Sequence, residues 1–252
     1  MLLTLVPAMG VTVNAAETWT TATTYDELKA ALSTQNPPDN IKLGSDIDTG
    51  TLSSGMGILE SLEVRGKKQL DPNGHTLRMY SAKTAMSNMF MINHGSLRNN
   101  TRWKRVIHCY AGGTVIINGG TLHVAPETYE NEKHSYGMYF EEEYGDLVNG
   151  SCGYTLMAAN SCKVSINGGT FQGPVHLDAG GNDWNQNEPR VKINGGTFEK
   201  KVMLNGPGDG TKSLTEINNG IFLDYVQAWV AATAFSHPKW SSTAVSSTRN
   251  FG

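Results

Sequence analysis

One stretch, Val164-Ser165-Ile166-Asn167-Gly168-Gly169-Thr170-Phe171, returns with small changes along this chain of 252 residues. A second copy, Val191-Lys192-Ile193-Asn194-Gly195-Gly196-Thr197-Phe198, differs from it at one position. Six shorter versions occur in all, at Pro72–Leu77, Ile92–Leu97, Ile117–Leu122, Ile166–Phe171, Ile193–Phe198 and Ile217–Phe222. A repeat of about 20–50 residues that carries β-branched side chains is typical of a solenoid, in which each repeat forms one coil.

The spacing of the copies is nearly regular. Their asparagines, Asn73, Asn93, Asn118, Asn167, Asn194 and Asn218, are 20, 25, 49, 27 and 24 residues apart. Because the interval of 49 residues is about twice the others, we expect one hidden or lost copy inside it. Tyr154, Leu156 and Ala158 alternate with other residues and predict a strand of this hidden coil.

Aligning the last three copies on their asparagine gives each position a role. Val or Thr and then Ile alternate before the asparagine, and a Phe comes five residues after the Ile. One coil cannot bury its own apolar face, so neighbouring coils must stack, with strands about 4.8 Å apart in parallel ladders. We therefore expect interior columns of Ile, Phe and Val, an asparagine ladder at a corner and a turn at the glycine pair.

Two other solenoids fit the pattern less well. A leucine-rich repeat needs a Leu-rich strand before its asparagine, whereas this chain has Val and Ile followed by two glycines. A hexapeptide β-helix needs a six-residue subperiod, which the sequence lacks. The prediction is an all-β, right-handed parallel β-helix with coils of about 24–27 residues and a short N-terminal capping helix.

The chain divides into a leader and one domain. We interpret residues 1–16 as the remnant of a secretory signal, because an apolar run too short to span a bilayer ends in Val13-Asn14-Ala15. No Lys or Arg precedes Lys29, so the basic start of such a signal is missing. Residues 17–252 form the predicted single β-helix domain, with a cap at 17–40, coils at 41–228 and a C-terminal cap at 229–252. The expected location is secreted or on the cell surface.

Both ends of the predicted domain have sequence patterns that differ from the repeat. Thr24-Tyr25-Asp26-Glu27 fits a capping box and predicts a helix from about residue 25 to residue 34. After Ala228 the repeat stops, and we expect a final β-hairpin or cap there, which would protect the open strand edges.

Composition excludes some classes of function. The net charge of −3 gives no basic field for nucleic acid. The three cysteines, Cys109, Cys152 and Cys162, are too few for a disulfide framework and lack zinc-ligand spacing, so no metal site is predicted. Either Cys152 and Cys162 form one bond, or all three are buried thiols.

A family resemblance rests on these motifs. Val-x-Ile-Asn-Gly-Gly-Thr-Phe resembles the coils of pectate-lyase-like right-handed β-helix domains from secreted and surface proteins of Gram-positive bacteria. Asp71-Pro72-Asn73-Gly74-His75-Thr76-Leu77 is similar to a phrase common in the same domains, with Pro72 replacing Leu. The resemblance covers residues 20–230 and implies the fold, while the functions of such domains are diverse.

Candidate ligand-binding residues lie where the repeat is broken. Residues 125–153 form an excursion of a length that is uncommon unless functional or disordered. Trp184 could stack on a sugar ring between the carboxylates of its own loop. The candidates are Tyr136, Tyr139, Glu141, Glu142, Glu143 and Tyr144 in the excursion, and Asp183, Trp184 and Glu188 in a later loop.

Two functions remain open. The first is a non-catalytic surface module, such as an adhesin, a carbohydrate-binding module or a rigid spacer, whose partner is a polysaccharide or host glycan. It would act as a monomer or as part of a longer surface protein, without a cofactor. The alternative is a polysaccharide lyase or glycoside hydrolase acting on a uronate-containing polysaccharide, and only this alternative calls for Ca²⁺. The Trp-Ile-Asp-His and Arg-x-Pro-x-x-Arg patterns of pectate lyases are absent, which favours the first function.

Overall fold

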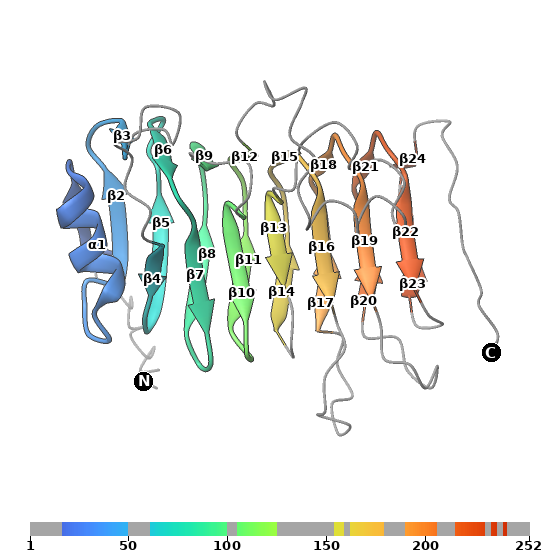
Figure 1. Cartoon of the computed structure of the whole chain (residues 1–252), viewed down its shortest axis with the longest axis horizontal. Coiled ribbons are helices and arrows are strands. Elements are labelled where there is room, and N and C mark those ends of the chain that lie inside the picture. Colours follow the sequence, from blue (N-terminus) through green and yellow to red (C-terminus); the bar gives the residue numbers. More distant parts are fainter. Residues whose placement is uncertain are drawn as a thin grey trace, which may run out of the picture.

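Three parallel β-sheets and one helix make up the described part of the chain (Figure 1). The computed structural model describes residues 17–49, 61–99, 105–124, 154–158, 162–178, 190–205, 215–229, 233–235 and 239–240. The strands of each sheet stand side by side along the long axis, from the helix at one end to the last strands at the other. This arrangement is consistent with the predicted β-helix.

Each sheet has a fixed order of strands. Sheet A contains β1 (Trp19–Ala22), β2 (Asn40–Leu43), β5 (Lys67–Asp71), β8 (Met89–Ile92), β11 (Thr114–Ile117), β14 (Lys163–Ile166), β17 (Val191–Ile193), β20 (Thr215–Ile217) and β23 (Thr233–Phe235). Sheet B contains β3 (Ile47–Asp48), β6 (Thr76–Met79), β9 (Ser96–Asn99), β12 (Thr121–His123), β15 (Thr170–Gln172), β18 (Thr197–Phe198), β21 (Ile221–Phe222) and β24 (Lys239–Trp240). Sheet C contains β4 (Leu62–Val64), β7 (Ala82–Ala85), β10 (Ile107–Tyr110), β13 (Leu156–Ala158), β16 (Val175–Asp178), β19 (Val202–Asn205) and β22 (Val226–Trp229).

From β2 onward the chain visits sheets A, B and C in turn and then begins again. Each strand therefore pairs in parallel with the strand three places later, as β11 does with β14 and β14 with β17. Equivalent residues of successive copies become direct neighbours, for example Ile117, Ile166 and Ile193. The predicted stacking of repeats is confirmed.

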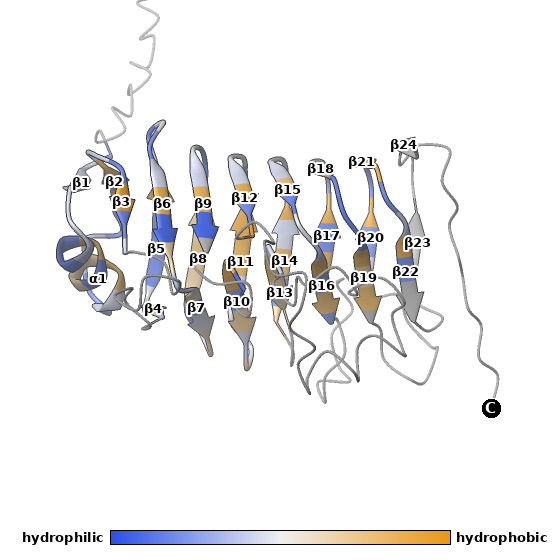
Figure 2. Cartoon of the chain, turned by 45° about the horizontal axis from the view of Figure 1, so that its top comes forward, coloured by the Kyte–Doolittle hydropathy of each residue, from blue (hydrophilic) through white to orange (hydrophobic). Residues whose placement is uncertain are grey.

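The interior consists of the predicted columns. Ile117, Ile166 and Ile193 are 0% exposed. The rings of Phe171 and Phe198 stack with centroids 4.7 Å apart, and the ring of Phe222 continues the stack at the same separation. Apolar bands recur at matching positions on neighbouring strands (Figure 2). Each buried side chain of this size contributes about 1.5–3 kcal/mol of transfer free energy.

The asparagine ladder is present and begins at Asn93. Each later asparagine donates from its side-chain amide to the side-chain oxygen of the previous one. The first of these bonds joins Asn118 to Asn93, and the last joins Asn218 to Asn194, both at 2.9 Å. Asn73, the first asparagine of the sequence alignment, is outside this ladder, since its amide donates to the Leu43 carbonyl. The register pairs Leu70 with Ile92, so the next residue, Asp71, holds the position opposite Asn93.

The prediction of a hidden copy between Asn118 and Asn167 is wrong. The two amides are hydrogen-bonded directly at 2.8 Å, and β11 pairs with β14 without an intervening strand. The strand predicted at residues 156–158 does exist, as β13, but it belongs to the same coil as β12. The extra length of this coil therefore comes from an insertion between β12 and β13.

The N-terminal end is closed by the helix α1 (Tyr25–Ser33). The capping box is present, since Thr24 accepts from the Glu27 N–H and the Glu27 carboxylate accepts from the Thr24 N–H. Leu28 and Leu32 are 0% exposed. Within the described residues no helix is long and apolar enough to cross a membrane.

Lys68 occupies a core position of β5, where neighbouring coils have Phe90 and Val115. Its ammonium donates to the carbonyls of Asn36 and Pro38, each at 2.8 Å. These bonds hold the segment after α1 over the first coils.

At the C-terminal end the parallel pairing continues past residue 228. β23 pairs with β20 and β24 pairs with β21, both in parallel. Among the described residues after Ala228, further parallel strands up to Trp240 therefore stand in place of the expected hairpin, and the cap at 229–252 stays a prediction.

Candidate functional site

The residues that the sequence singled out lie outside the described residues. This holds for Tyr136, Tyr139, Glu141, Glu142, Glu143 and Tyr144, and for Asp183, Trp184 and Glu188. Their roles stay predictions. The flanking residues show where the two segments leave the scaffold. Residues 125–153 connect sheet B to sheet C, and residues 179–189 connect sheet C to sheet A.

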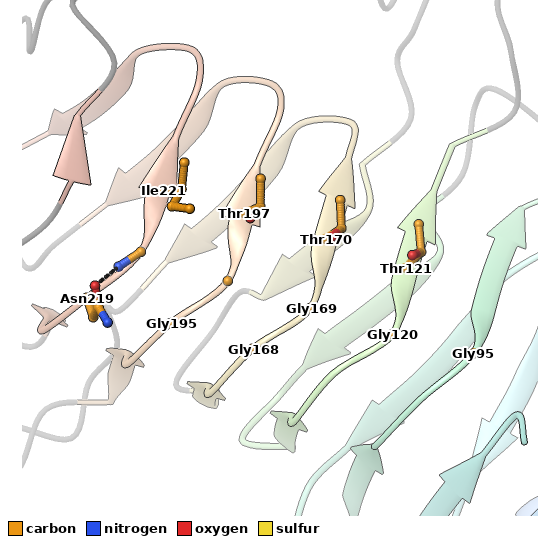
Figure 3. Close-up of a pocket in the computed structure, with 12 residues that line it drawn as sticks. Gly95, Gly120, Thr121, Gly168, Gly169, Thr170, Gly195, Thr197, Asn219 and Ile221 are labelled. Carbon is orange, nitrogen blue, oxygen red and sulfur yellow. Dashed lines mark hydrogen bonds between the residues drawn. The ribbon is translucent and has the colours of Figure 1, made fainter. Parts of the chain in front are cut away.

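A groove of about 560 Å³ follows the glycine-rich corner between sheets A and B (Figure 3). Thr121, Thr170, Thr197 and Ile221 lie in one row along it. The glycines are required here, because Gly120 has a φ of +88° and an added Cβ would lie 2.8 Å from the Gly95 carbonyl oxygen. The described residues that line the groove are glycines, threonines, Asn219 and Ile221, so they offer backbone groups, hydroxyls and an amide to a ligand.

Chemically richer side chains gather on the outer surface of sheet C. Strand pairing aligns one outward position of successive strands, because side chains alternate between the two faces of a sheet. In order, this row holds Glu63, Lys83, His108, Met157, His176, Met203 and Gln227, of which Met203 is buried. Basic and imidazole groups from separate coils are thus brought into one line, although they are far apart in the sequence.

Aromatic rings accompany both histidines. The ring of His108 lies 5.2 Å from that of Tyr110, two residues later on β10. The ring of His176 lies 5.8 Å from that of Tyr154, which is 3% exposed and precedes β13. Together with Lys83, Arg105, Met157 and Asp178, these residues form what we call the sheet C face.

Electrostatics favour the neutral form of His176. Burial lowers the pKa of this imidazole, and the charge of Arg105 adds to the effect. The carboxylate of Asp178 opposes it and raises the pKa. A neutral imidazole can accept a proton at one nitrogen and donate from the other, so a lowered pKa suits His176 to hydrogen bonding with a ligand or to base catalysis.

Two cations lie at the corner between sheets B and C. The Arg105 side chain donates from Nε to the Met157 sulfur at 3.0 Å, which holds it against the sheet C face. Lys201 is 6% exposed, and its ammonium lies 4.7 Å from the centroid of the Tyr225 ring. The excursion at residues 125–153 leaves the scaffold at this same corner, between β12 and β13.

Sequence reasoning missed the sheet C face for a definable reason. His108 and His176 stand at outward positions, where the repeat does not constrain the residue type, so no motif marks them. Correct alignment across the long coil would have paired His108 with Met157 and Met157 with His176. The assumption of a hidden copy prevented that alignment.

The described residues contain no group of three or more His, Cys, Asp or Glu side chains placed to hold a metal ion. No protein-family model, curated protein or solved structure matches this chain. Any functional assignment therefore has to be argued from the geometry described above.

Proposed function

We propose that this chain is a secreted or cell-surface module of the pectate-lyase-like, right-handed parallel β-helix type, and that it binds an extended carbohydrate without transforming it. The sheet C face is the observation that carries the proposal. It combines rings, imidazoles and cations on a rigid scaffold of parallel strands. The half-buried ring of Tyr110 supplies apolar stacking surface for a sugar, while imidazole and ammonium groups supply hydrogen bonds that fix its orientation. The ring of Tyr154 is buried and packs beside His176.

The shape of the ligand follows from the repeat. Successive strands of a sheet lie about 4.8 Å apart, so equivalent side chains form a line of evenly spaced contacts. A polymer that lies along this line can contact Lys83, His108 and His176 in succession. A line of contacts across several coils suits an extended chain better than a small molecule.

The charge of the face indicates the class of polymer. Lys83 and Arg105 provide two cations on this outer surface, and Glu63, the cross-strand neighbour of Lys83, and Asp178 provide two carboxylates. Arg forms paired, charge-assisted hydrogen bonds with carboxylates. Because the Arg105 guanidinium can pair with a uronate carboxylate in this way, we expect acidic polysaccharides, such as polygalacturonate, to bind more tightly than neutral ones.

Affinity electrophoresis of the full chain in polygalacturonate and in neutral dextran tests the proposal. Tyr110→Ala should weaken retardation by polygalacturonate about 2- to 12-fold, since an aromatic contact contributes about 0.5–1.5 kcal/mol. Lys83→Ala should weaken binding to the acidic polymer. Lys163→Ala, an exposed lysine on sheet A, is the matched control and should leave binding unchanged. Equal retardation of all variants would refute the site.

One observation favours a polysaccharide lyase as the second candidate. Burial lowers the pKa of the His176 imidazole, and the charge of Arg105 lowers it further. A lyase needs a base that removes the proton next to a uronate carboxylate and a cation that neutralises this carboxylate. His176 and Arg105 would supply these two roles.

The two candidates predict different effects of His176→Gln. If the chain is a lyase, incubation with polygalacturonate, with and without Ca²⁺, releases unsaturated products that absorb ultraviolet light, and the substitution abolishes the release. If the chain only binds, the wild type forms no such product and the substitution changes affinity alone. Product formation by the wild type would replace the first proposal by the second.

A further inference from the structure

The described cysteines, Cys109 and Cys162, are close neighbours in the core although 52 residues separate them in the sequence. Cys109 points inward from β10 and is 0% exposed, and Cys162, just before β14, is 1% exposed. Both belong to the same hydrophobic cluster. Both side chains are thiols in the structure, and interaction with the Cys162 thiol together with burial raises the pKa of the Cys109 thiol.

Backbone pairing explains why these two positions meet. The N–H of Lys163 donates to the carbonyl of Gly113 at 2.9 Å, which places Cys162 next to the turn that follows β10. Before this turn in the chain, β10 pairs with β13, and Cys109 lies opposite Ala158. The contact therefore connects two successive coils at the corner between sheets C and A, and it is fixed by the register of both sheets.

We infer that Cys109 and Cys162 are a disulfide site that covalently joins these two coils. The covalent loop that the bond would close runs from Cys109 to Cys162 and contains the insertion at residues 125–153. A bond across the corner would hold the register of β10, β13 and β14 irrespective of that insertion. This pairing differs from the Cys152–Cys162 bond that the sequence left open.

The chemistry requires an oxidant with a disulfide of its own, such as glutathione disulfide. One cysteine thiolate attacks the oxidant, forms a mixed disulfide and releases one thiol. The second thiolate then attacks the mixed disulfide, forms the Cys109–Cys162 bond and releases the second thiol. Two protons and two electrons pass to the oxidant in total. Because burial disfavours thiolates in the folded protein, the exchange takes place before the coils close.

Peptide mapping tests the inference directly. The full chain is refolded in a mixture of reduced and oxidised glutathione, free thiols are alkylated under denaturing conditions, and the unreduced protein is digested. We expect a linked peptide pair containing Cys109 and Cys162 that disappears after reduction. Recovery of both cysteines in alkylated form, or a link from Cys152 to either of them, would overturn the inference.

Thermal unfolding gives a second readout. Reductant should lower the Tm of the oxidised wild type by roughly 5–15 °C, because a bond that closes a long loop restricts the unfolded chain. The Tm of the Cys109→Ala/Cys162→Ala double variant should not respond to reductant, whereas Cys152→Ala should respond like the wild type. A wild type whose Tm is the same with and without reductant would contradict a bond in the core.

Discussion

At the scale of single residues, the corner asparagines couple one coil to the next through side chains. Asn167 donates to Asn118 at 2.8 Å and accepts from Asn194 at 2.9 Å. An asparagine is suited to this position because its amide is both donor and acceptor, so identical residues can bond in series. The ladder thus adds one hydrogen bond per coil to those of the backbone.

Replacing Asn167 by Ala should lower the free energy of unfolding by about 1–2 kcal/mol, because two ladder bonds and the bond from the Ser165 hydroxyl are lost at an exposed corner. Asn93→Ala is the comparison variant, since Asn93 stands at the start of the ladder and accepts from Asn118. Asn93→Ala should lower the free energy of unfolding by about half as much as Asn167→Ala does. Urea unfolding of both variants measures the difference, and equal losses would show that the ladder bonds contribute little.

Lys68 is the residue whose role depends on pH. Burial lowers the pKa of its ammonium, and the more distant Asp39 carboxylate opposes the shift. Between the lowered pKa and the usual pKa of lysine, the unfolded chain binds more protons than the folded one, so stability rises with pH in this alkaline window. At lower pH the charged ammonium is buried at a cost in free energy, which its bonds to the Asn36 and Pro38 carbonyls offset in part.

Lys68→Met should therefore remove an alkaline rise in stability that the wild type shows. The neighbouring Lys67 is exposed and belongs to the same strand, so Lys67→Met is the matched control and should keep the rise. Urea unfolding at a series of alkaline pH values measures both variants. If Lys68→Met keeps the slope of the wild type, the ammonium is not the group responsible.

At the scale of elements, the strands were predictable where the interior is periodic. Columns such as Ile117, Ile166 and Ile193 follow from alternation, because inward positions must be apolar in every coil. The strand β1 and the shift of Asn73 out of the ladder were not predictable. Both depend on pairing with coils that lack the repeated phrase, where local sequence does not fix the register.

The phenylalanine stack gives the prediction at this scale. Phe198 lies between Phe171 and Phe222, with a ring centroid at 4.7 Å on either side. Phe198→Ala should cost about 3–5 kcal/mol, because it leaves a cavity and interrupts the stack. Phe198→Leu, which fills most of the space, should cost clearly less. Thermal unfolding compares the two, and similar losses would mean that the volume at this position matters little.

At the scale of the whole molecule, the repeat predicted the stacking but not the length of each coil. An interval of 49 residues is compatible with two ordinary coils or with one coil that carries an insertion, and spacing alone cannot distinguish them. Only the direct bond between Asn118 and Asn167 separates the two cases. The sheet C face could not be predicted for the same reason, since its members align only after the insertion is removed.

Removal of residues 125–153 should leave the fold intact. The shortened chain would join β12 to β13 through Val124, Tyr154 and Thr155, three residues, as many as the Glu199–Lys201 segment that joins β18 to β19. The parallel pairing on both sides of the insertion needs no residue from it. Circular dichroism and thermal unfolding should therefore resemble those of the full chain, and loss of β-structure would show that the insertion is required for folding.

The same deletion decides where ligand binding resides. Tyr136, Tyr139, Tyr144 and Glu141–Glu143 are removed, whereas His108, Tyr154 and His176 remain. If the sheet C face binds the polymer, retardation in polygalacturonate should survive the deletion and should still be weakened by Tyr110→Ala. If binding disappears while the fold remains, the excursion carries the ligand contacts, and the Tyr- and Glu-rich segment replaces the sheet C face as the binding site.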